Sequence, residues 1–159
     1  MTPVSPRAYL LAVLALSAIP VAPTHAETPS EMCARVRTDD TVRPIPESLA
    51  PAVNAAFGTN MPAGIATATT LFRCADAKVL VCTVGANLPC GPANTSTIPA
   101  SGMTDWCRSN PDADFIPAVV VGHDTIFAWR CQNGSVGIVR QVEEVDARGF
   151  IARVWKTLP

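Results

Sequence analysis

Six cysteines limit the folds open to this 159-residue chain, because each pair that joins ties two separate segments together. They are Cys33, Cys74, Cys82, Cys90, Cys107 and Cys131, and all of them follow an apolar N-terminal segment. An even number of cysteines in an exported chain favours disulfides, here three, with the pairing left open. A zinc site is the alternative, but the sequence has no CxxC pair, the usual source of zinc-binding thiolates. We therefore expect a disulfide-stapled fold and no metal.

The N-terminal segment has the three parts of a secretory signal peptide. Arg7 supplies the positive charge, residues 8–22 form the apolar run, and Ala26 is the small residue at the expected cleavage position. The run is shorter than the about 20 apolar residues that span a bilayer. We expect residues 1–26 to be removed and residues 27–159 to form one periplasmic or secreted domain, without a stable membrane span.

The charge of the expected mature chain argues against nucleic acid as a partner. Loss of Arg7 leaves more acidic than basic residues, and the basic residues form no stripe. Nucleic-acid binding depends on such a concentration of positive charge. The length suits a single domain with a core of its own, which the disulfides would supplement.

Residues 27–64 are predicted to form an N-terminal arm and one helix. The adjacent acids Asp39 and Asp40 lie in the polar arm. Neighbouring side chains on an extended chain point apart, so a solvated loop is favoured over a catalytic carboxylate pair. Residues 46–57 show four-residue apolar spacing, which predicts a helix that covers a sheet, with Ser48 as N-cap and Gly58 after its end.

Residues 65–159 are predicted to be a β-rich core. Runs of β-branched and apolar residues between turn residues are typical of strands. The predicted strands are residues 65–74, 78–84, 115–121, 125–131, 136–145 and 150–155, with a short helix over 104–110 capped by Thr104. Asn133-Gly134 suits a type I′ turn that places Trp129 opposite Ile138. The expected fold class is α+β: mainly antiparallel β hairpins or a meander, with one or two short helices.

The first predicted hairpin restricts the disulfide pairing. A tight turn at Asp76-Ala77 makes Cys74 and Cys82 project from opposite faces of the two strands. A bridge between them is therefore disfavoured. Cys82 is expected to pair instead with Cys90 or Cys107.

The residues available for catalysis are few. His123 is the single histidine after the signal segment, which excludes two-histidine zinc sites and leaves one imidazole for any histidine-dependent hydrolase. Together with Asp124 it lies in a predicted turn between strands, where a reactive group can be presented. Gly-His-Asp is equally an ordinary turn composition. The sequence lacks a nucleophile elbow and both phosphate-binding glycine motifs, so we expect no cofactor.

Two groups of residues are candidates for a binding surface. Asn87 and Leu88 occupy the loop between Cys82 and Cys90, where a staple on a rigid sheet would present them. Trp106 and Arg130 belong to the residue types that commonly anchor interfaces. The alternative is that the tryptophans are core residues and the arginines are solvated.

Three motifs resemble those of a family of small exported proteobacterial proteins of unknown function. They are CTVGANLPCG at residues 82–91, WCR with NP at 106–111, and GHDTIFAWRC at 122–131. The resemblance covers most of residues 71–155. It implies a Gram-negative periplasmic or secreted setting, and the family offers no catalytic residues to transfer.

These observations favour a non-catalytic binding or interaction protein of the periplasm or the medium. Its expected partner is a protein or small-molecule component of the cell envelope. The first alternative is a small periplasmic hydrolase that uses His123 with a nearby carboxylate. The second is a purely structural envelope protein.

Overall fold

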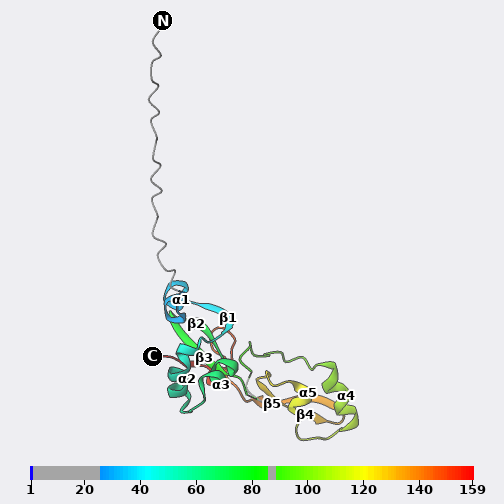
Figure 1. The fold of residues 1–159 in the computed structure, drawn as a ribbon. Helices are drawn as coiled ribbons and strands as arrows, with labels where there is room; N and C mark the ends of the chain where they lie inside the picture. Colours follow the sequence, from blue (N-terminus) through cyan, green and yellow to red (C-terminus); the bar gives the residue numbers. More distant parts are fainter. Residues whose placement is uncertain (2–25, 86–88) are drawn as a thin grey trace.

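The computed structural model describes Met1 and residues 26–85 and 89–159. The fold is α+β with antiparallel sheets and three disulfides, which confirms the predicted class. Figure 1 shows a larger part, with α1, α2 and α3 around a sheet, and a smaller part built on a hairpin. The larger sheet has the order β1-β2-β3-β6, formed by Asp39–Pro44, Thr70–Ala75, Lys78–Thr83 and Lys156–Thr157. The smaller sheet pairs β4 (Phe127–Gln132) with β5 (Ser135–Gln141).

The N-terminal arm is more ordered than the sequence suggested. Helix α1 (Pro29–Val36) begins with a capping box, in which Thr28 and Glu31 satisfy each other's backbone N–H groups. The acidic pair lies in strand β1, so the expected solvated loop is wrong. An edge strand tolerates polar side chains because part of it faces solvent, and this is why its composition reads as a loop.

Helical structure over residues 46–57 is confirmed, but its start differs from the prediction. A short 3-10 turn, η1 (Glu47–Leu49), leads into α2 (Ala50–Phe57), and Ser48 lies inside that turn instead of capping the helix. The helix ends as predicted at Gly58, which adopts the left-handed conformation with φ 65°. Helix α3 (Ala63–Thr69) then replaces the first half of the predicted strand 65–74.

The β2–β3 hairpin has the predicted register. Asp76 and Ala77 both have positive φ, as a type I′ turn requires. Phe72 lies opposite Val81 and Cys74 opposite Val79, so these four side chains share one face. The register follows from the turn and the two-residue period of a strand, both of which are local properties.

The second half of the chain contains three further helical segments. Helix α4 (Ser101–Ser109) starts three residues before the predicted cap Thr104. The predicted strand 115–121 is wrong: residues 118–121 form α5 (Ala118–Val121), and residues 115–117 are not in a strand. The short turn η2 (Ala152–Val154) interrupts the predicted strand 150–155. In α5 and η2 tertiary contacts outweigh the strand propensity of valine.

The second hairpin also has the predicted register. Its turn residues Asn133 and Gly134 have φ values of 50° and 76°. Trp129 lies opposite Ile138, as expected from a two-residue turn. The β4–β5 pair is therefore a local structure of the Asn-Gly sequence and its flanking strands.

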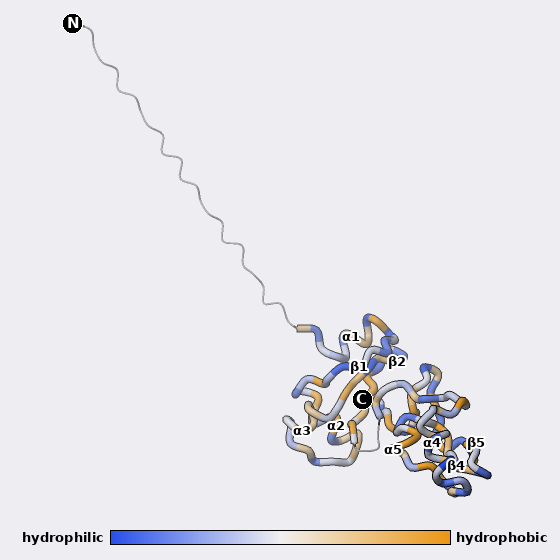
Figure 2. Tube along the Cα trace, turned by 90° about the vertical axis from the view of Figure 1, so that its right-hand side faces the viewer, coloured by the Kyte–Doolittle hydropathy of each residue, from blue (hydrophilic) through white to orange (hydrophobic). Residues whose placement is uncertain are grey.

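Each disulfide lies within a different hydrophobic cluster. Cys33–Cys74 is in the cluster between the larger sheet and α1 and α2. Cys82–Cys90 is in a second cluster with Phe150 and Trp155, and Cys107–Cys131 is in a third under α4. The absence of a Cys74–Cys82 bridge and the pairing of Cys82 with Cys90 agree with the prediction. Figure 2 shows apolar stretches in both parts of the molecule, as this division requires.

Among the described residues, no helix has the length and apolar character needed to cross a membrane.

Candidate ligand-binding site

The predicted catalytic candidates lie in the bend between α5 and β4. His123 is exposed, and within residues 26–85 and 89–159 its ring has no hydrogen bond or ion pair. Gly122 has φ +92°, and a Cβ added there would lie 2.7 Å from an Asp124 carboxylate oxygen. Asp124 also accepts a backbone hydrogen bond from Asn94 at 2.8 Å. His123 and Asp124 are thus adjacent residues of one bend. The Asp124 carboxylate lies against the backbone of Gly122.

The predicted binding-surface residues do not form one group. Trp106 is half-buried on α4 against the third hydrophobic cluster, and Arg130 is exposed on β4. Asn87 and Leu88 lie outside the described residues. In the part of the chain that the structure describes, no three His, Cys, Asp or Glu side chains are grouped as a metal site requires.

A buried arginine, Arg73, forms a cluster that was not predicted from the sequence. The Arg73 side chain on β2 is 0% exposed and forms ion pairs with Asp146 and, at 3.6 Å, with Asp40. Its guanidinium carbon lies 4.1 Å from the Phe150 ring centroid and 4.6 Å from that of Trp155. The sequence did contain a signal of this burial. The predicted strand alternation places Arg73 on the same face as the apolar Leu80.

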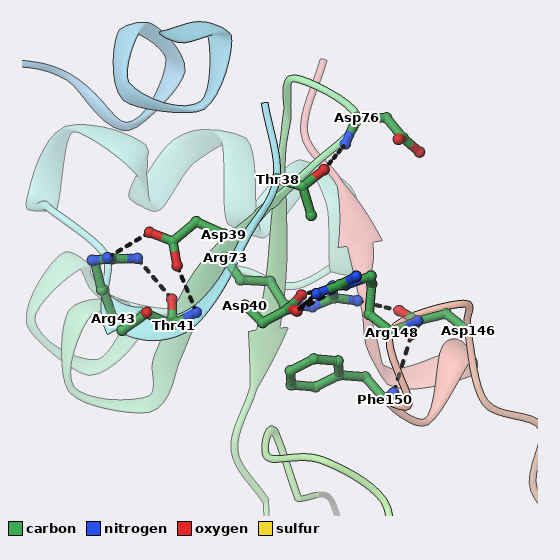
Figure 3. A network of polar contacts seen from close by, with 10 residues as sticks. All are labelled: Thr38, Asp39, Asp40, Thr41, Arg43, Arg73, Asp76, Asp146, Arg148 and Phe150. Carbon is green, nitrogen blue, oxygen red and sulfur yellow. Dashed lines mark hydrogen bonds and ion pairs between the residues drawn. The ribbon is translucent and has the colours of Figure 1, made fainter. Parts of the chain in front are cut away.

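The Arg73 cluster ties together three segments that are far apart in sequence. Figure 3 shows Arg73 among Asp40 of β1, Asp146 and Arg148, with the Phe150 ring beside them. Arg148 Nε donates to Asp40 at 2.8 Å, so the two acids and two arginines alternate in charge. Stacking on aromatic faces adds to these ion pairs. The cluster joins strand β2 to its neighbour β1 and holds the segment before η2 against this part of the larger sheet.

The folded structure lowers the pKa of two carboxyl groups near this cluster. Burial raises the pKa of Asp146, but backbone N–H donors from Phe150 and Arg148 and the charge of Arg73 outweigh it. The backbone N–H of Thr41, with the Arg43 guanidinium, lowers the pKa of Asp39 to about 2. Both groups bind protons less readily in the folded chain than in the unfolded chain.

We expect these two carboxylates to make the protein acid-sensitive. Their stabilisation is fully present above the unfolded pKa of about 4 and is lost as pH falls toward the lower folded values. The difference in unfolding free energy between the wild type and Asp146→Asn should therefore be large at pH 6 and shrink below pH 4. Urea unfolding at several pH values measures this difference. The exposed acid Asp105 is the control, and an Asp105→Asn effect equal to that of Asp146→Asn would contradict the prediction.

The structure also contains an apolar pocket that the sequence did not predict. It is a partly open pocket of about 360 Å³ at one end of the larger sheet, where the covering helix α2 stops. Three separate segments supply its walls: the end of α2 with the connector after it, the end of β3, and residues 153–156. The apolar and charged side chains that line it are Phe57, Met61, Val84, Arg153, Val154 and Lys156.

Of the two cationic side chains at this pocket, Arg153 has an ionic partner and Lys156 has none among the described residues. Arg153 donates to both oxygens of Glu143, and the hydrogen bond to that carboxylate raises the pKa of Arg153. Lys156 is exposed, and no ion pair to it occurs among the described residues. None of the described residues that line the pocket is acidic. The pocket therefore combines apolar walls with a positive edge.

No family model, no curated protein and no solved structure matches this chain.

Proposed function

We propose that this chain is an exported, non-catalytic binding protein that holds a small apolar ligand in the pocket at the end of α2. The observation that supports this most strongly is the pocket itself. Its volume of about 360 Å³ falls within the range of small-molecule sites, about 300–1,000 Å³. Its walls include aromatic, thioether and valine side chains, which are typical of such sites.

The surfaces of the pocket residues support a binding role. Val84 is 46% exposed, although it is apolar and follows directly after strand β3. Phe57 and Met61 are half-buried, so part of each side chain still contacts water. A ligand that covers these three side chains would remove their apolar surface from water, which is the main favourable term in such binding.

The cysteines and the N-terminal segment support the cellular setting of the proposal. Disulfides form and persist in oxidising compartments, and all six cysteines are paired in the structure. The first 26 residues have the pattern of a cleavable signal peptide. A periplasmic or secreted location agrees with both features, as it does with the proteobacterial resemblance. Envelope components are the ligands that such a protein would meet.

The proposal predicts saturable binding of a neutral apolar fluorophore. N-phenyl-1-naphthylamine should fluoresce more strongly on addition of the oxidised protein, and Val84→Asp should weaken its binding at least about tenfold. A carboxylate beside the ligand would lose part of its hydration when the ligand fills the pocket, and this cost opposes binding. Fluorescence titration of both proteins measures the effect.

Val139→Asp is the matched control for this titration. Val139 is 48% exposed, close to the value for Val84, but lies on β5 in the smaller sheet. Its replacement should leave the dissociation constant unchanged. Absence of saturable binding by the wild type, or an equal loss in both variants, would refute the proposed site.

A further inference from the structure

We propose that the ligand is an acidic amphiphile, with a single apolar chain in the pocket and an anionic group paired with Lys156. This inference rests on the proposed function and adds the chemical class of the ligand. It commits to a free single-chain acid, such as a medium-chain fatty acid, because the pocket is at the small end of the range for ligand sites.

The position of Lys156 places its charge at the pocket. Strand β6 pairs Lys156 with Val81, so both residues project from the same face of the larger sheet. Val81 is fully buried in the cluster under the covering helices. One step further along β3, Thr83 reaches the same face beyond the end of α2, and both Thr83 and Lys156 line the pocket. The backbone of Lys156 is therefore fixed by strand pairing, and its side chain starts beside the apolar walls of the pocket.

The neighbouring carboxylate is already committed to the other cation. Glu143 accepts two hydrogen bonds from Nε of Arg153 at 2.8 and 2.7 Å, and a third from Nη2 at 2.5 Å. The Glu143 side chain is 18% exposed, and this paired geometry nearly neutralises Arg153. In the described part of the chain, Lys156 has no such carboxylate. The net charge at the pocket is therefore positive, and it selects an anion.

A neutral ligand and an acidic ligand differ in what they do to Lys156. An apolar chain that fills the pocket brings low-dielectric material close to the ammonium group and removes some of its water. A neutral ligand leaves that cost without compensation, whereas an acid group at the edge pairs with the ammonium ion. Because Lys156 is exposed, the preference should be modest, about three- to fivefold in dissociation constant.

The test is displacement of N-phenyl-1-naphthylamine by two ligands that share a ten-carbon chain, decanoate and decanol. Both are used at pH 7.5, at low salt and below the concentrations at which they aggregate. The wild type should release the fluorophore at about three- to fivefold lower decanoate than decanol, and added salt should reduce this ratio. In Lys156→Gln the two ligands should become about equal, mainly because decanoate loses its ionic partner, while decanol improves at most slightly because no ammonium group is left to desolvate. Equal displacement by both ligands in the wild type would overturn the inference.

Lys78→Gln is the control, because Lys78 is the other lysine of the chain and lies outside this pocket. It should keep the preference for decanoate. Retention of that preference in Lys156→Gln would also overturn the inference. The neutral fluorophore does not require an ionic partner in Lys156, so either failure would leave the proposed function standing. Loss of fluorophore binding by the wild type would refute both. Thermal unfolding of each variant confirms that it is folded.

Discussion

Replacement of Arg73 by alanine is expected to lower the free energy of unfolding at pH 7 by about 3–5 kcal/mol. The substitution removes the cation that faces Asp40 and Asp146 and the group that stacks on Phe150 and Trp155. It also leaves a cavity, because the Arg73 side chain is fully buried. The two acids are 30% and 26% exposed, so water will hydrate them in part and the loss should be near the lower end of the range. Denaturant unfolding of the disulfide-intact protein measures it.

The second hairpin supplies the matched control for Arg73. Arg130 precedes a disulfide cysteine on β4 just as Arg73 does on β2, but Arg130 is exposed. Arg130→Ala should change the free energy of unfolding by less than about 0.5 kcal/mol. Similar losses in the two variants would show that burial of the guanidinium does not cause the effect.

Arg73→Met separates the contribution of charge from that of volume. Methionine fills much of the same space but leaves Asp40 and Asp146 without their buried cation. The loss should therefore persist in Arg73→Met and diminish when Asp40→Asn and Asp146→Asn are added, because the ion cluster is then replaced as a unit. A full loss in the triple variant would point to stacking on the aromatic rings as the dominant interaction.

Removal of the Cys33–Cys74 disulfide is expected to cost more than removal of Cys82–Cys90. The two bridges span sequence separations of 41 and 8 residues. Restriction of the unfolded chain grows with the length of the closed loop, which gives about 4 kcal/mol for the first bridge and about 2.5 kcal/mol for the second. Unfolding of the Cys33→Ala/Cys74→Ala and Cys82→Ala/Cys90→Ala double variants measures this difference.

Apart from the disulfide, the two double variants lose similar amounts of buried side-chain packing. All four cysteines are at most 4% exposed, so replacement by alanine removes similar packing in each case. The longer bridge also attaches α1 to strand β2, and α1 should become more accessible to protease without it. A larger loss in the Cys82–Cys90 variant would mean that loop length does not govern the contribution of these bridges.

The hairpins could be predicted from the sequence because their determinants are close together. Asp76-Ala77 and Asn133-Gly134 form tight turns, and each turn sets which residues of its two strands are opposite. The side-chain period of two then separates Cys74 from Cys82 without any knowledge of the rest of the fold. Errors arose where packing decided against the local pattern: α3 forms over a stretch predicted as a strand, and α5 is helical although three of its four residues are valine.

The candidate site could not be predicted in the same way. The chemical types of His123, Asp124, Trp106 and Arg130 made them candidates, but the structure leaves them on separate surfaces or in local packing. No single residue of the pocket belongs to a motif that would identify it in the sequence. They form a site only because α2 ends where strand β3 continues and the C-terminal segment returns beside it.

The sequence by itself determined the turns, the hairpin registers, the end of α2 at Gly58 and the exclusion of a Cys74–Cys82 bridge. Each of these depends on backbone preferences that act over a few residues. Only the tertiary structure decided that Cys33 joins Cys74, that Arg73 is buried against Phe150 and Trp155, and that Lys156 borders an apolar pocket. These contacts join segments tens of residues apart, and their formation depends on the packing of the whole chain.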